Sequence, residues 1–186
     1  LRYVSTRGRR HRRSDNGKMY WEAATESAKI FAPTFWNSIA GLSLDKESAA
    51  VSSLRTSGNK LKLLLLNPFS DAFSVHSKKL LATDGDLPEG ATEHYVEKVT
   101  LLAKLLSESG GLLKFYDVYP TVSFVIVDDK ECKIDLVLPK TNVDARPVLE
   151  VDNQTSSGDT LFDVFSRVFI SFWDSSQSAA DVLGLE

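Results

Sequence analysis

Three charged residues, Asp117, Glu131 and Lys133, have types and spacing that could do chemistry. Two carboxylates can hold a divalent metal ion, and a neighbouring lysine can assist the water that attacks a metal-bound substrate. Asp117 lies in one candidate strand, and Glu131 follows it by fourteen residues, in or beside a turn. The spacing therefore allows a metal-dependent hydrolytic site, provided that the two segments meet in the fold.

This skeleton resembles the active site of restriction-type nucleases, in which an acid on one strand precedes a Glu-x-Lys pair. The chain departs from that pattern at Tyr116, where the family usually has a proline before the first acid. The alternative interpretation is an ordinary charged hairpin turn, because such spacings arise by chance in a chain with 25 acidic residues. A metal-dependent nuclease therefore stands as the alternative function.

Histidine and cysteine usage limits the kinds of site that the chain can build. His11, His76 and His94 lie in three separate segments without a paired histidine or cysteine, so no histidine metal site is expected. The single cysteine, Cys132, excludes a disulfide framework and a cysteine-based zinc site within one chain, and favours a reducing, cytoplasmic location. No cofactor is expected. No apolar run approaches the roughly 20 residues of a membrane span.

The basic and acidic side chains are unevenly distributed along the chain. Residues 1–20 hold seven basic side chains and one acid, a charge of +6, so the remainder carries −3 − 6 = −9. We expect residues 1–18 to form a basic arm or linker and residues 19–186 to form a single α/β domain. Such an arm can bind nucleic acid through counterion release, or can act as a linker or a docking strip for the acidic body. The candidate nucleic-acid contacts are Arg7, Arg9, Arg10, Arg12 and Arg13.

The apolar periodicity predicts alternating helices and strands. Helices are expected over residues 19–29, 45–58, 92–110 and 160–176, with Thr92 capping the third and Asp159 or Thr160 capping the last. Strands are expected over residues 60–67, 112–118, 122–128, 133–139 and 146–152, and residues 30–39 could form a bulged strand or an irregular edge. A hairpin is expected between residues 122–128 and 133–139. This order predicts an α/β fold, a mixed β-sheet with helices on both faces.

Residues 118–130, VYPTVSFVIVDDK, resemble the catalytic-motif strand of the phospholipase D superfamily, His-x-Lys-x4-Asp, with its chemistry replaced. Counting back seven from Asp128 puts Thr121 at the histidine position and Ser123 at the lysine position. In that family, strand alternation points the histidine and the lysine at one phosphate, and the aspartate lies at the end of the strand. Threonine and serine can hydrogen-bond an anion, but neither replaces an imidazole nucleophile or a charged phosphate clamp.

Other segments match this superfamily in the same order. KLKLLLLNPFSDAF is similar to a strand and loop of non-catalytic bacterial members, and the closing phenylalanine-rich helix ending near Trp173 resembles theirs. The family's Gly-Ser-x-x-Asn segment is missing after Asp128. The resemblance covers residues 19–180 and implies a phospholipase D-like sandwich that serves as a sensor, ligand-binding or dimerisation domain of a larger regulatory or signalling protein. It implies Thr121, Ser123 and Asp128 as ligand-binding residues, and a homodimer or a fused upstream domain as partner.

A near-match to the same motif occurs in VHSKKLLATDGD, which contains His76, Lys78 and Asp84. Here the aspartate comes one residue late, and no strand alternation precedes the histidine. We therefore expect the similarity to be accidental and His76 to be a surface histidine on a helix or loop.

Overall fold

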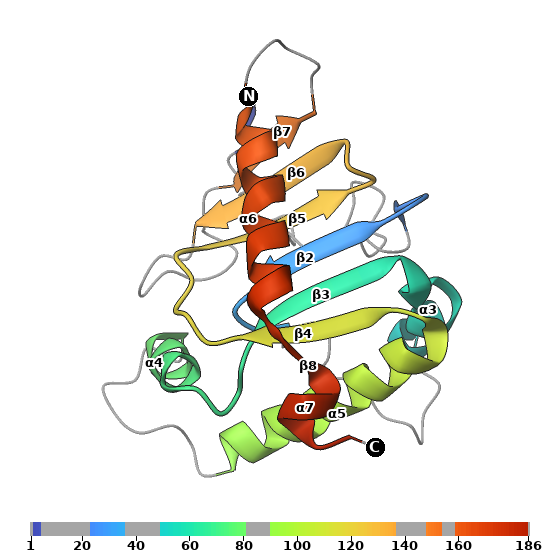
Figure 1. Cartoon of the computed structure of the whole chain (residues 1–186), viewed down its shortest axis with the longest axis vertical. Helices are drawn as coiled ribbons and strands as arrows, with labels where there is room; N and C mark the ends of the chain where they lie inside the picture. Colours follow the sequence, from blue (N-terminus) through green and yellow to red (C-terminus); the bar gives the residue numbers. More distant parts are fainter. Residues whose placement is uncertain are drawn as a thin grey trace.

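The computed structural model describes residues 2–4, 23–35, 49–80, 90–136, 148–153 and 159–185, which form a mixed eight-stranded sheet and its helices (Figure 1). In spatial order the strands are β1 (Arg2–Val4), β7 (Val148–Asp152), β6 (Glu131–Leu136), β5 (Val122–Val127), β2 (Ala28–Ala32), β3 (Leu61–Leu66), β4 (Leu112–Tyr116) and β8 (Gln177–Ser178). The helices are α3 (Ala49–Ser57), α4 (Asp71–Leu80), α5 (Ala91–Ser109), α6 (Leu161–Ser175) and α7 (Ala179–Leu183), with a short 3-10 helix, η1 (Gly58–Lys60). The predicted α/β class is confirmed.

The strand directions define two edges of the sheet. β2, β3 and β4 run parallel, and the segments that connect them carry α3 and then α4 and α5. β5 returns antiparallel beside β2, and β6 and β7 continue antiparallel from it. The carboxyl ends of β2, β3 and β4 therefore lie at the same edge as the start of β5. We call this the carboxyl edge.

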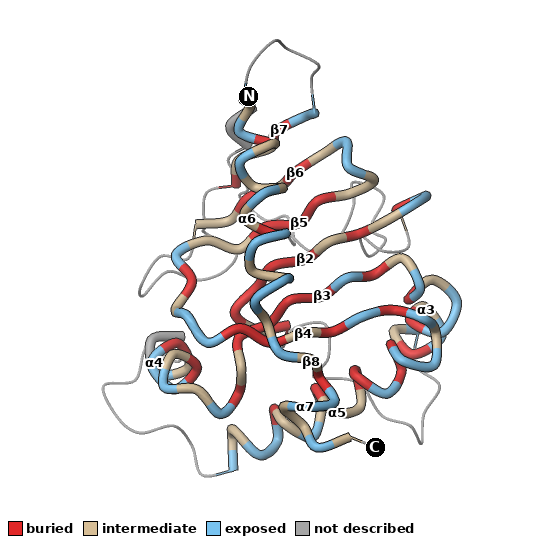
Figure 2. Tube along the Cα trace, viewed as in Figure 1, coloured by how far each residue is buried: buried red, intermediate tan, exposed pale blue. Residues whose placement is uncertain are grey.

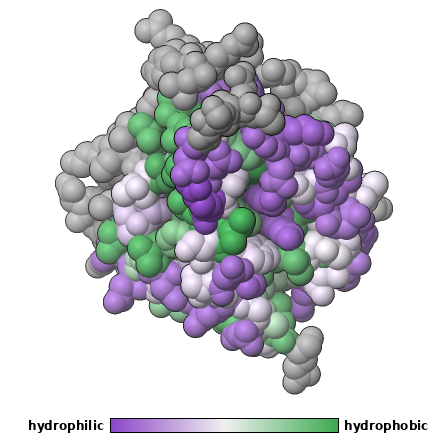
Figure 3. Space-filling view, turned by 45° about the horizontal axis from the view of Figure 1, so that its top comes forward, coloured by the Kyte–Doolittle hydropathy of each residue, from purple (hydrophilic) through white to green (hydrophobic). Residues whose placement is uncertain are grey.

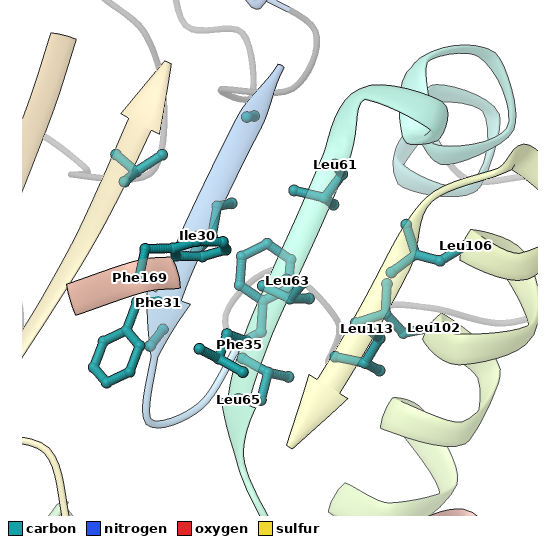
Figure 4. Close-up of a cluster of buried hydrophobic side chains, with 14 of the residues drawn as sticks. Ile30, Phe31, Phe35, Leu61, Leu63, Leu65, Leu102, Leu106, Leu113 and Phe169 are labelled. Atoms are coloured by element: carbon teal, nitrogen blue, oxygen red, sulfur yellow. The ribbon is translucent and has the colours of Figure 1, made fainter. Parts of the chain in front are cut away.

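Side-chain alternation divides the core into two layers, one on each face of the sheet. On the face that carries α6, the Phe31 ring stacks on Tyr116 (4.7 Å) and Phe124 (5.1 Å) and meets the edge of Phe172 (5.1 Å). On the other face, Figure 4 shows leucines of α5 beside Leu113 of β4. The predicted helices on both faces are thus present.

The continuous leucine run of β3 is explained by its central position. Leu61 and residues 63–66 are fully buried, and Figure 2 shows the buried positions concentrated in the middle of the sheet. From Leu63 onward the strand has neighbours on both sides and is covered on both faces, so alternation of polar and apolar residues disappears, whereas Lys62 near its start is exposed. Full burial of each such leucine contributes roughly 1.5–3 kcal/mol. The strand and the helix α3 before it agree with the sequence-based predictions.

The predicted helix over residues 19–29 is wrong for all of its described residues except Ala23, because residues 24–27 are not helical and Ala28 and Lys29 begin β2. β2 is neither bulged nor an edge, since it pairs with β3 on one side and β5 on the other. Ala28 lies between Leu61 and Val127 in this pairing and is completely buried. Long-range strand pairing here overrides the helical preference of an alanine-rich segment.

The predicted caps of the helices have mixed outcomes. Thr92 does not cap α5, because the helix begins at Ala91 and follows Gly90, which has φ 77°. Thr160 does cap α6: its hydroxyl accepts a hydrogen bond from the Asp163 amide, and the Asp163 carboxylate accepts one from the Thr160 amide. This reciprocal pair is a capping box, which satisfies two amides at the exposed end of the helix.

Three residues of the predicted basic arm belong to the sheet. Arg2–Val4, which the sequence assigned to the arm, form the edge strand β1 and pair antiparallel with β7. The five candidate arginines, Arg7, Arg9, Arg10, Arg12 and Arg13, lie outside the described residues. Within the described ranges, no helix is both long enough and apolar enough to cross a membrane.

Candidate functional site

Thr121 and Ser123 lie at the carboxyl edge of the sheet. Thr121 is exposed directly before β5, and Ser123 is the second residue of that strand, opposite Asp135 of β6. The two residues are thus two positions apart at the start of β5. Within the described part of the chain, neither hydroxyl makes a hydrogen bond to another protein group. Thr121 is exposed, and Ser123 is partly buried.

Asp128 lies at the other end of β5, about 17 Å from Ser123 at the usual strand rise. One carboxylate oxygen accepts hydrogen bonds from the Thr25 amide (3.0 Å) and the Thr25 hydroxyl (2.9 Å). The other accepts from the amides of Glu26 (2.7 Å) and Ser27 (3.0 Å). Desolvation of the carboxyl group acts to raise its pKa, but the hydrogen bonds from this segment together hold the pKa of Asp128 well below its usual range. The structure thus does not bring Asp128 to Thr121 and Ser123.

The turn that contains Asp128 explains why an aspartate stands there. Asp128 and Asp129 have φ of 52° and 53°, and the Lys130 amide donates to the Val127 carbonyl at 3.0 Å. These are the features of a type I′ turn, and aspartate tolerates the left-handed region better than most residues. Asp129 also pairs with Lys29 at 2.5 Å. The two aspartates therefore fasten the β5–β6 hairpin to the start of β2, a structural role that the sequence interpretation missed.

Two neighbouring loops extend beyond the carboxyl edge. The Asn67 amide, just after β3, donates to the Tyr116 carbonyl at the end of β4 (2.8 Å), which holds the loops side by side. Two residues beyond this bond lie Phe69 on one loop, 63% exposed, and Val118 on the other, 62% exposed. These are the most exposed large apolar side chains in the described part of the chain. The edge that carries Thr121 thus also presents an apolar surface.

His76 is not a surface histidine, so that prediction is wrong. It lies on α4 and is only 1% exposed, with its ring 5.9 Å from that of Tyr119. Phe73, one helical turn earlier, packs on Tyr95 of α5 at 4.9 Å. The spacing of three turns Phe73 and His76 to the same buried side of the helix. Lys78 is exposed on α4, and Asp84 lies outside the described residues, so no strand presents this near-match to the phospholipase D motif.

The alternative nuclease residues do not converge. Asp117 follows β4, whereas Glu131 and Lys133 are on β6, four strands away, which is about 19 Å at the usual strand spacing. β6 runs parallel to β4, so the start of β6 and the end of β4 also lie at opposite edges. Lys133 instead pairs with Glu131 (3.0 Å) and Glu150 (3.3 Å). No cluster of three or more potential metal ligands is present among the described residues.

No protein-family model matches the chain, and no curated protein matches it.

Proposed function

We propose that the chain is a non-catalytic, phospholipase D-like ligand-binding domain of a larger regulatory or signalling protein. Its ligand lies at the carboxyl edge, where Thr121 and Ser123 donate hydrogen bonds to an anionic group and Phe69 and Val118 cover an apolar part. One observation carries the proposal: the two most exposed large apolar side chains in the described residues lie on adjacent loops at the edge that bears Thr121. Open α/β sheets bind ligands outside the carboxyl ends of their parallel strands, and exposed apolar surface marks binding sites.

The contacts of the motif residues favour binding over catalysis. A hydroxyl nucleophile needs an adjacent general base. The Thr121 and Ser123 hydroxyls are hydrogen-bonded to no histidine or carboxylate within the described residues. The Asp128 carboxylate is engaged by the segment Thr25–Ser27 at the far end of β5. The position that carries the motif aspartate therefore serves the fold.

Calorimetric titration with octyl phosphate tests the proposal, because this probe combines an anion with an apolar chain. It should bind more tightly than inorganic phosphate, which lacks the chain, and than octanol, which lacks the anion. The double variant Thr121→Ala/Ser123→Ala should weaken octyl phosphate binding about thirtyfold, since it removes two hydrogen bonds that contribute about 1 kcal/mol each. Ser107→Ala, an exposed serine of α5, is the matched control and should bind like the wild type.

Two outcomes would contradict this function. Octyl phosphate could bind the double variant as tightly as the wild type, which would remove Thr121 and Ser123 from the site. Alternatively, the wild type could hydrolyse bis(p-nitrophenyl) phosphate and the double variant could fail to do so. That result would make the chain an enzyme.

The proposal includes a homodimer and a cytoplasmic location. The homodimer rests on the resemblance, in which active members pair two motif strands, and sedimentation velocity over a range of concentrations tests it. The location rests on cysteine usage. The only thiol, Cys132, is buried, and burial together with the charge of Glu131 raises its pKa to about 12, so it is unreactive at neutral pH.

A further inference from the structure

A group of lysines lies on the α6 face of the sheet, away from the carboxyl edge. Lys29 of β2 is aligned with Lys62 of β3, and Lys62 is aligned with Leu112 of β4. Lys114 follows two residues after Leu112, so alternation places all four side chains on the face of Phe31. With Trp173 of α6, these residues form what we call the lysine patch. Figure 3 shows hydrophilic residues next to hydrophobic ones on this side of the molecule.

Trp173 organises two of these lysines. The Lys114 ammonium donates to the Trp173 carbonyl at 2.8 Å and lies 5.1 Å from the centre of the indole ring. The Lys62 ammonium lies 5.9 Å from the same ring. Phe169 stacks on the indole at 5.6 Å, so protein groups already occupy the aromatic surface. Cation–π contacts therefore hold both ammonium groups near one point.

The charges of the lysine patch are incompletely balanced. Like charges aligned on neighbouring strands repel each other, as Lys29 and Lys62 do here. Asp129 pairs with Lys29, but within the described residues no carboxylate pairs with Lys62, which is exposed. Leu112, aligned with Lys62, is 50% exposed. The patch thus combines an available positive charge with uncovered apolar surface.

We propose that the lysine patch docks an acidic peptide segment of a partner protein. Carboxylates of the segment meet Lys62 and Lys114, and an apolar side chain covers Leu112. This surface is separate from the carboxyl edge, so the inference goes beyond the ligand-binding function proposed above.

Two features favour a short acidic peptide over nucleic acid. Phe169 and the Lys114 ammonium already contact the ring of Trp173, which disfavours stacking of a base on it. Residues 21–186 carry a net charge of −9, which repels a long polyanion but tolerates a short segment at a local basic site. The three strands that carry the patch span roughly 10 Å, which is a width suited to one extended segment.

Fluorescence polarisation with a labelled nine-residue Glu/Leu peptide tests the proposal, with a Gln/Leu peptide of the same length for comparison. The wild type should prefer the Glu/Leu peptide, and raising the salt concentration should weaken the complex. Lys62→Gln should weaken binding about threefold and Lys62→Glu about tenfold, the range expected for an exposed charge pair lost or reversed. Lys104→Glu, an exposed lysine of α5, is the matched control and should have no effect.

Misfolding of the variants is not expected to mimic a loss of binding, because Lys62 is exposed, and circular dichroism can confirm that each variant is folded. Equal affinity of Lys62→Glu and the wild type for the Glu/Leu peptide would overturn the proposal. So would failure of the wild type to distinguish the two peptides. Tighter binding of a single-stranded thymidine oligonucleotide, lost in Lys62→Glu, would also overturn it and make the patch a nucleic-acid surface.

Discussion

Replacing Asp128 with glycine removes the anchor of the β5–β6 hairpin without straining the turn, because glycine adopts φ near 52° freely. The change deletes the acceptor of four hydrogen bonds. A hydrogen bond to a charged group contributes roughly 1.5–3 kcal/mol. These amides lie near the surface and can bind water instead, so we expect a total loss of about 2–3 kcal/mol, which is comparable to one such bond and not to the sum of four.

Asp129→Gly is the matched control for this prediction. It stands in the same turn, has φ 53°, and loses one ion pair to Lys29 whose carboxylate side is 57% exposed. That loss should cost about 1 kcal/mol or less. Both glycine variants gain the same relief of backbone strain, so this contribution cancels when the two are compared. The difference between their free energies of unfolding then reports how much more the Asp128 carboxylate contributes to stability than the Asp129 carboxylate does. Urea unfolding followed by circular dichroism measures it. Equal stability of the two variants would refute the anchoring role.

The pH dependence of the Asp128 contribution has a defined sign. Its pKa is lower in the folded state than the ordinary value of 3.8, so the unfolded chain binds the proton more readily. The stabilisation is therefore complete above the ordinary pKa and is lost as pH falls through the lower pKa of the folded state. The stability gap between the wild type and Asp128→Asn should be constant from pH 7 to about pH 5 and should shrink below pH 4. A gap that widens on acidification would contradict the assignment.

Three further substitutions test local packing and backbone conformation. A Cβ atom at Gly111 would lie 2.4 Å from the Gly58 carbonyl oxygen and 2.7 Å from a Leu106 methyl, so Gly111→Ala should cost about 2–3 kcal/mol in urea unfolding. A Cβ atom at Gly90 would meet no atom within 4 Å, so Gly90→Ala should lower the free energy of unfolding by only about 1–2 kcal/mol, because of the φ of 77°. A larger decrease for Gly90→Ala than for Gly111→Ala would contradict the structure. The buried Tyr116 hydroxyl has no hydrogen-bond partner among the described residues. Tyr116→Phe should therefore raise the free energy of unfolding by about 1 kcal/mol in urea unfolding. A decrease of about 1 kcal/mol would show instead that the hydroxyl is hydrogen-bonded.

Local patterns in the sequence predicted the elements whose burial follows from their own residues. The leucine run of β3 indicated a buried strand, and the apolar stripe of α5, which is followed by Gly110 with φ 82°, indicated a packed helix. The β5–β6 hairpin was also predicted, although its Asp-Asp turn lacks the usual glycine. These features depend on side-chain periodicity and backbone preference within a few residues.

The errors concern features that depend on contacts between distant segments. Ala28 joins a strand because Leu61 and Val127 flank it, and neither neighbour is visible in the local pattern. His76 is buried because α4 packs near Tyr119. The order and direction of the strands likewise place Asp117 and Glu131 at opposite edges of the sheet, although they are only fourteen residues apart in the sequence. Sequence spacing constrains side-chain direction within an element, but it does not determine which elements become neighbours.

Mapping octyl phosphate onto the chain by ¹H–¹⁵N correlation spectroscopy tests the central claim most directly. Ligand binding at the carboxyl edge predicts saturable shifts concentrated in residues 67–70 and 117–123, with the hairpin turn at residues 128–131 unchanged. Shifts concentrated at that turn or at the lysine patch, or the absence of saturable shifts anywhere, would contradict the claim that the carboxyl edge is the binding site.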